Sequence, residues 1–183
     1  RYIFTLLKGT RYMILDIVKY PDPRLKLKAE SVGEITDEIR ALAANMAETM
    51  YAAPGVGLAA PQVGVSLRML VMDPSGPDER KDLRVVINPK LTPHGDMIVS
   101  EAEGCLSVPH NYRADVKRYE RVTLEATDLE GKAIVEELEG YPAIVVQHEA
   151  DHLDGILFID HISRLRRTMY DAKVRKCLKR GKN

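Results

Sequence analysis

The sequence predicts a single α+β domain whose strands pair mainly in antiparallel fashion. Its 183 residues are enough for one globular domain with a sizeable core, and no linker-like segment divides them. Hydrophobic periodicity indicates one amphipathic helix, then a run of strands, then two helices, without the regular strand–helix alternation of parallel α/β folds. The composition, 45% hydrophobic and 30% charged, is typical of a folded protein rather than a disordered one.

The first dozen residues stand apart from the rest of the chain. The sequence begins with Arg1, and the apolar run at 3–7 is too short for a signal sequence. Met13, followed by an apolar segment, is a more typical first residue of a protein. We therefore expect residues 1–12 to be an N-terminal extension that arises from cloning or from the choice of start site. The alternative is a native N-terminal tail without a function of its own.

The first helix is expected to begin after Thr36, a residue that can cap it, and to end near Ala53, before a proline and a glycine. A glycine-rich loop follows at 55–64. Beyond it, apolar runs bounded by turn-forming residues predict strands at 67–72, at 83–88 and several more within 96–139.

Two helices are expected near the C-terminus. Pro142 suits the first turn of one of them, and Gly155 suits its C-terminal end. The last helix should span 163–180. It carries an apolar stripe that is expected to dock on the body of the protein: Ile162, Leu165, Met169 and Ala172.

Charge and cysteine content exclude several classes of protein. Bases and acids both number 27, which argues against a chain that wraps nucleic acid, and no sequence-specific nucleic-acid partner is expected. No apolar run approaches the roughly 20 residues of a membrane-spanning helix. Two cysteines cannot build a disulfide framework, which favours a reducing compartment. The charge is unevenly distributed, with nine bases and one acid from residue 161 onwards.

The clearest chemistry lies in the segment HEADH, from His148 to His152. Residues four apart in a helix lie one turn apart on the same face, so both imidazoles can reach one metal ion. Glu149 is adjacent to that face, where it can contact a water on the metal without being a ligand. The alternative, a chance match on a solvated helix face, is disfavoured because the chain has only five histidines.

The third metal ligand is less obvious. In the extended protease pattern H-E-x-x-H-x-x-G-x-x-H, Gly155 is in register, but Phe158 occupies the last position and cannot bind a metal. His161 lies three residues too late. The best remaining soft ligand is Cys105, because Gly104 lets the backbone approach closely. Alone, Cys105 would be interpreted as a small buried hydrophobic residue.

Three protein ligands leave one tetrahedral position open, as in catalytic rather than structural zinc sites. Such a metal lowers the pKa of its water and polarises a carbonyl, so the pattern predicts hydrolysis. The developing charge on the carbonyl oxygen requires fixed donors. Gln62, in the loop at 55–64, is a candidate donor, although the loop alone would be interpreted as a tight turn after a helix.

Three segments together resemble the signature motifs of the peptide deformylase family: GVGLAAPQ at 55–62, EGCLS at 103–107 and QHEADH at 147–152. The resemblance covers residues 13–170, and a basic tail at 171–183 follows. It implies a small α+β domain whose strands surround the metal-bearing helix. It also implies a bacterial cytoplasmic enzyme that removes the N-formyl group from the initiator methionine of new polypeptides.

The resemblance further implies roles for individual residues. One divalent metal ion would be held by three side chains: Cys105, His148 and His152. Glu149 would be the general acid and base. The oxyanion would be stabilised by two donors: Gln62 and the backbone N–H of Leu106. The extended backbone of an N-formylmethionyl polypeptide would pair with three residues: Val56, Gly57 and Gly104.

The ligands do not fix the identity of the metal. A cysteine and two histidines fit Zn²⁺ by softness and geometry. The family resemblance implies Fe²⁺ in the cell, and Zn²⁺, Ni²⁺ or Co²⁺ could occupy the same ligands in a crystal.

The helix face that carries His148 also carries apolar residues at helical spacing: Tyr141, Ile144 and Val145. An apolar wall beside a water-activating metal suits an aliphatic side chain such as that of methionine. Plain core packing is the alternative for each of them.

The basic C-terminal helix has two interpretations. Runs of charge commonly serve solubility. The functional alternative is electrostatic docking on the ribosome, close to the emerging chain.

Three other functions remain open from the sequence. A zincin-type metalloprotease is disfavoured by Phe158. A cysteine hydrolase would pair Cys105 with a histidine and need no metal. A ribosome-binding module with a vestigial metal site would not be an enzyme.

Overall fold

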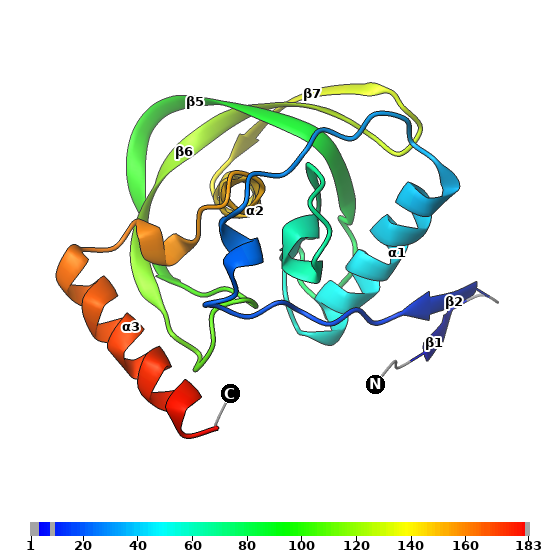
Figure 1. Ribbon diagram of the computed structural model, residues 1–183. Coiled ribbons are helices and arrows are strands. Elements are labelled where there is room, and N and C mark those ends of the chain that lie inside the picture. Colours follow the sequence, from blue (N-terminus) through cyan, green and yellow to red (C-terminus); the bar gives the residue numbers. More distant parts are fainter. Residues whose placement is uncertain (1–3, 8–9, 182–183) are drawn as a thin grey trace.

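An antiparallel sheet of five strands organises the chain, in the order β3-β4-β5-β6-β7 (Figure 1). The computed structural model describes residues 4–7 and 10–181. The strands are β3 (Gly57–Ala59), β4 (Met69–Met72), β5 (Arg84–Glu103), β6 (Ala114–Thr127) and β7 (Ala133–Glu139). Every neighbouring pair is antiparallel, which confirms the predicted α+β fold with mainly antiparallel strands.

The long strands β5 and β6 curl over a central helix, α2 (Tyr141–Leu153) (Figure 1). Register shifts interrupt the β5–β6 pairing at three places, and such bulges bend a strand and increase its twist. The predicted end of a strand at Asn88 is therefore wrong. Asn88 adopts a positive φ of 51° and exchanges two hydrogen bonds with the Val32 backbone, and β5 continues beyond it.

Helix α2 begins and ends where the sequence predicts. Pro142 lies in its first turn, and Gly155 follows its C-terminus with a φ of 72°. A Cβ at Gly155 would lie 2.7 Å from the Lys26 carbonyl carbon, so this position requires glycine for both conformation and space. Six of its 13 residues are buried because β3, β4, β6 and β7 pack around it.

Helix α1 (Asp37–Ala52) covers the β3–β4 end of the sheet, where fully buried Met46 and Met50 pack against Leu58 and Met69. Thr36 occupies the N-cap position as expected, but its side chain makes no capping hydrogen bond to the backbone.

The glycine-rich segment is not simply a loop. Residues 57–59 form the edge strand β3, and Ala60–Val63 form a short 3₁₀ helix, η2. Pairing with β4 from Leu70 to Met72 supplies the strand hydrogen bonds. Local sequence does not reveal such pairing, because glycine has a low strand propensity.

The last helix, α3 (Arg164–Lys179), docks through residues other than the members of the predicted stripe that lie within it, whereas Ile162, just before the helix, does pack against the core as expected. Leu165 and Met169 are 72% and 66% exposed, whereas Tyr170 and Val174 are each only 2% exposed. The ring of Tyr170 packs against Tyr20 and Tyr112, with centroids 6.0 and 4.4 Å apart. These aromatic partners set the rotation of the helix. Because α3 runs from Arg164 to Lys179, the domain boundary predicted after residue 170 falls inside this helix.

Short elements complete the chain. The described part of the predicted extension contributes strands β1 (Phe4–Leu7) and β2 (Thr10–Met13), which pair antiparallel; residues 1–3 and 8–9 lie outside the described residues. Two more 3₁₀ helices are η1 (Pro23–Lys26) and η3 (Phe158–Asp160). Among the helices of the described residues, none has the length and apolarity needed to cross a membrane.

Candidate metal centre and pocket

The structure brings Cys105, His148 and His152 together beside α2. One ligand atom from each side chain lies within 4.8 Å of those of the other two, and the Cys105 Sγ is 3.2 Å from the His152 Nε2. The histidines come from successive turns of α2, and the cysteine comes from the turn that follows β5. In that turn the Ser107 N–H donates to the Cys105 Sγ and the Val108 N–H donates to the Cys105 carbonyl.

This cluster has the chemistry of a metal site. A thiolate and two imidazoles are the donors that soft and borderline divalent metals prefer. Burial lowers the pKa of His152 well below its usual range, so this imidazole is neutral with a lone pair free for a ligand. The three residues present therefore fit a single divalent ion.

A chain of ion pairs connects the cluster to the surface. His148 Nδ1 is 3.0 Å from the Glu103 carboxylate, which also accepts two hydrogen bonds from Arg118. Arg118 Nη1 in turn donates to Asp151, which is 2.7 Å from the His161 Nε2. Burial raises the pKa of Glu103, but hydrogen bonds from His148 and Arg118 outweigh it and lower the pKa to about 2. Glu103 is therefore ionised and fixes the orientation of the His148 ring.

Arg118 is a residue that motif analysis missed. It occupies a core-facing position of β6, in alternation with buried Ala114 and Val116, and is only 3% exposed. An inward-facing arginine in an alternating strand was the available signal, because a buried charge requires a partner.

Arg118→Met is expected to weaken metal binding about 10- to 100-fold, as is usual when the hydrogen-bonding partners around a ligand are lost. The physical reason is that Glu103 would lose its counter-ion and no longer orient His148. Chelator competition on the purified variant measures this affinity, and Arg118→Lys should retain part of it. Arg121→Met, on the exposed side of the same strand, is the matched control. Unchanged metal affinity in folded Arg118→Met would contradict the assignment.

Glu149 lies next to the cluster with its carboxylate unsatisfied. The side chain is 5% exposed, and among the described residues Oε2 has no hydrogen-bond partner. Burial raises the pKa of Glu149 to about 7, although nearby His148 and Arg118 act to lower it. A buried carboxylate without a partner costs free energy, and such groups occur where chemistry requires them.

Gln62 is fixed with its amide nitrogen toward the cysteine. Its Oε1 accepts from the Ala59 N–H at 2.8 Å, which sets the orientation of the amide. Nε2 then lies 3.1 Å from the Ser107 Oγ and 3.5 Å from the Cys105 Sγ. The side chain thus presents a donor at the cluster from η2.

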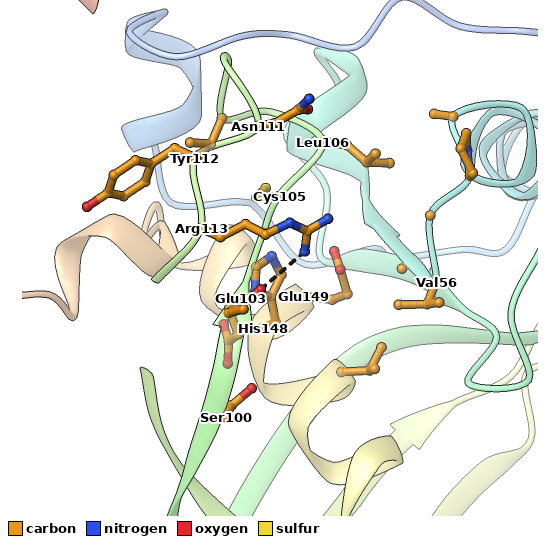
Figure 2. A pocket seen from close by; sticks show the side chains of 18 of the residues that line it. Val56, Ser100, Glu103, Cys105, Leu106, Asn111, Tyr112, Arg113, His148 and Glu149 are labelled. Atoms are coloured by element: carbon orange, nitrogen blue, oxygen red, sulfur yellow. Dashed lines mark hydrogen bonds and ion pairs between the residues drawn. The ribbon is translucent and has the colours of Figure 1, made fainter. Parts of the chain in front are cut away.

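A cavity of about 780 Å³ opens in front of the cluster (Figure 2). Every predicted site residue except the more deeply buried His152 lines it: Val56, Gly57, Gln62, Gly104, Cys105, Leu106, Tyr141, Ile144, Val145, His148 and Glu149. The edge strand β3 and the end of β5 flank the cavity, and α2 supplies the apolar wall. The twelve predicted residues are therefore assembled around one pocket.

The loop at 109–113 was not predicted to belong to the pocket. Figure 2 shows the Arg113 side chain extending into it, and Arg113 Nη1 donates to the Ala102 carbonyl at 3.1 Å. The loop reaches this place through positive φ angles at His110 and Asn111. These are non-glycine residues, so the sequence carries no strong signal for the turn.

Comparisons with known proteins agree with this geometry. Residues 14–168 match the model of a family described as polypeptide deformylase. A peptide deformylase of Psychrobacter arcticus is 49% identical over 166 residues, which cover 91% of this chain and 89% of the relative. The crystal structure of a peptide deformylase from Legionella pneumophila has a TM-score of 0.83 and 41% identity, and covers 91% of this chain and 96% of that one. A Met-Ala-Ser-bound class I type b peptide deformylase from Acinetobacter baumannii has a TM-score of 0.75 and 37% identity, covering 81% and 98%.

Proposed function

The chain belongs to the polypeptide deformylase family, which removes N-formyl groups from nascent peptides, and we propose that it does so at the Cys105–His148–His152 centre with Glu149 as general acid and base. One observation carries this proposal. The buried carboxylate of Glu149, without a partner in the described chain, adjoins a three-ligand cluster at the base of an open pocket. Metal-dependent hydrolysis of the formyl amide needs that combination of metal ligands, proton acceptor and substrate space.

We propose Fe²⁺ as the metal in the cell, in line with the family resemblance, with Zn²⁺, Ni²⁺ and Co²⁺ able to occupy the same ligands. When bound, such an ion polarises the formyl carbonyl and lowers the pKa of a water. Metal analysis of protein purified without oxygen tests the identity of the metal.

Glu149 would move the proton in this reaction. Its carboxylate accepts a proton from the attacking water and later passes it to the departing methionine nitrogen. Burial raises the pKa of this carboxyl towards the working pH, where an acid–base group is most effective. Gln62 Nε2 and the Leu106 N–H would donate to the oxygen on which charge develops.

The pocket supplies places for an extended peptide. β3 is the edge strand of the sheet, so the backbone of Val56 and Gly57 can pair with an added strand, and Gly104 offers a second backbone edge across the cavity. Tyr141, Ile144 and Val145 would receive the methionine side chain. The structural relative that binds Met-Ala-Ser has the same fold, which supports a formylmethionyl peptide as substrate.

Gly57→Ala is expected to lower kcat about a hundredfold or more, within the range of general acid–base contributions, while the metal is retained. A Cβ at Gly57 would lie 2.6 Å from the Glu149 Cδ, so the carboxylate must move. Steady-state kinetics with metal analysis measures the effect. Gly33→Ala is the matched control, because a Cβ there meets nothing within 4 Å. Full activity in Gly57→Ala would show that the carboxylate position is unimportant.

The reaction itself is tested by product analysis on formyl-Met-Ala-Ser. A deformylase releases formate and intact Met-Ala-Ser. The metalloprotease alternative, which the comparisons do not support, would instead cut an internal bond of formylated and unformylated peptides alike.

We propose further that residues 13–170 form the catalytic domain and that the enzyme works in the bacterial cytoplasm. The family match over 14–168 and bacterial relatives support this. Cys105 and Cys177 are both free thiols, which suits a reducing compartment.

We propose that the basic C-terminal helix contacts the ribosome through the surface that carries Arg175 and Lys179. Arg175 and Lys179 are exposed, and their side chains have no ion-pair partner in the part of the chain that the structure describes. Arg175→Glu/Lys179→Glu is expected to reduce co-sedimentation with ribosomes severalfold at low salt, because each change reverses a charge that faces anionic RNA. Unchanged co-sedimentation would remove the ribosome as a partner of this surface.

A further inference from the structure

A second cavity, of about 500 Å³, adjoins the active-site pocket. It lies between the start of β6 and helix α3, and its lining is Tyr112, Arg113, Ala114, Asp115, Arg166, Met169, Tyr170 and Lys173. Tyr112 and Arg113 line both cavities, so these two residues lie between them and the cavities are neighbours. We call the second cavity the α3 groove. It lies beyond the loop at 109–113, on the side of α3.

The α3 groove has a basic rim. Its residues on α3 recur at i, i+3, i+4 and i+7, so they share one helix face. The described part of the chain gives no ion-pair partner to Arg113, Arg166 or Lys173. The only acid of the lining is Asp115, whose Oδ1 already accepts the Ala102 N–H at 3.0 Å.

Neighbouring Arg167 differs from the cations of the groove because it is paired with acids of the protein. It lies on the same helix, but its guanidinium is fully engaged by Asp160, Asp171 and Tyr20. Acidic side chains of the protein itself therefore neutralise the charge of Arg167. The charges of Arg113, Arg166 and Lys173 remain available to an external anion.

We propose that the α3 groove binds the downstream residues of the formylated polypeptide and favours acidic side chains there. This inference rests on the proposed function, because it needs a peptide whose formylmethionine occupies the metal pocket. A nascent chain is longer than three residues, and the neighbouring groove offers a place for the residues that follow. Arg113, Arg166 and Lys173 supply charge, and the exposed Met169 and the Tyr112 ring supply apolar contact.

Two peptides test this preference. One is formyl-Met-Ala-Ser followed by Gly-Asp-Glu-Asp, and the other has Gly-Lys-Arg-Lys in the same places. The kcat/KM for the acidic peptide should exceed that for the basic one about tenfold at low salt, since each exposed charge pair contributes modestly. The ratio should approach one at 0.5 M salt, where such pairs are screened.

Charge-reversal variants test whether the preference for the acidic peptide arises in the α3 groove. Arg166→Glu/Lys173→Glu should abolish or invert the ratio, while kcat/KM for formyl-Met-Ala-Ser stays within about twofold, because neither side chain lines the metal pocket. Arg175→Glu/Lys179→Glu makes the same change of charge outside the groove and should keep the ratio.

Several outcomes would overturn the proposal. They are equal rates for the two peptides, a preference that Arg166→Glu/Lys173→Glu leaves intact, or a groove variant that loses ribosome binding and not peptide preference. The last result would assign the groove to ribosomal RNA. Failure of the proposed function looks different, because no formate would then be released even from formyl-Met-Ala-Ser.

Discussion

Glu149→Gln is expected to lower kcat/KM for formyl-Met-Ala-Ser about a thousandfold while the metal content stays unchanged. Glutamine has nearly the shape of glutamate but cannot accept the proton of the attacking water. Loss of a positioned general base typically costs 10²- to 10⁴-fold. The measurement is formate release together with metal analysis of the same preparation.

The control for this variant is Glu139→Gln, which removes an exposed carboxylate just before α2. It should leave kcat/KM unchanged. A Glu149→Gln protein that keeps its metal and its full activity would refute the assigned mechanism. The variant is also expected to be at least as stable as the parent, because it replaces a buried ionisable carboxyl with a neutral amide.

Cys105→Ala is expected to lose both the metal and the activity. The change removes the one thiolate of the cluster and leaves two imidazoles, which hold a divalent ion far more weakly. Metal analysis after dialysis should show less than a tenth of an equivalent, and formate release should fall to background, at least about a thousandfold.

Cys177→Ala is the matched control, because Cys177 is the other free thiol and lies on α3 away from the cluster. It should retain metal and activity. A cysteine hydrolase would behave differently. Thiol alkylation would inactivate it whether or not a chelator had removed the metal, and a metal-free preparation would remain active.

The parts of the site that are local in sequence could be predicted from the sequence. His148 and His152 share a helix face whatever the rest of the chain does, so their pairing followed from spacing alone. Pro142 and Gly155 marked the ends of the same helix, as observed. Cys105 required more, because only the absence of a third histidine in register, together with the preference for a soft ligand, pointed to it, and the family motifs then agreed.

The parts of the site and fold that depend on pairing between distant segments could not be predicted from the sequence. Arg118 matters because the pairing of β6 with β5 brings its side chain into contact with Glu103. Arg113 matters because of a turn without glycine. The continuity of β5 beyond Asn88 depends on bulges that local propensity does not reveal. The stripe of Leu165 and Met169 failed for a related reason. Hydrophobic spacing shows that a helix has an apolar face but not which aromatic rings will meet it.

The most direct test of the account is a metal titration of the apoprotein on formyl-Met-Ala-Ser. Chelator-treated protein should release no formate, and added Fe²⁺, without oxygen, should restore release linearly up to one equivalent. Formate and Met-Ala-Ser should appear in equal amounts, with the Met–Ala bond intact. Undiminished formate release by the metal-free protein, or cleavage at an internal peptide bond, would contradict a metal-dependent deformylase.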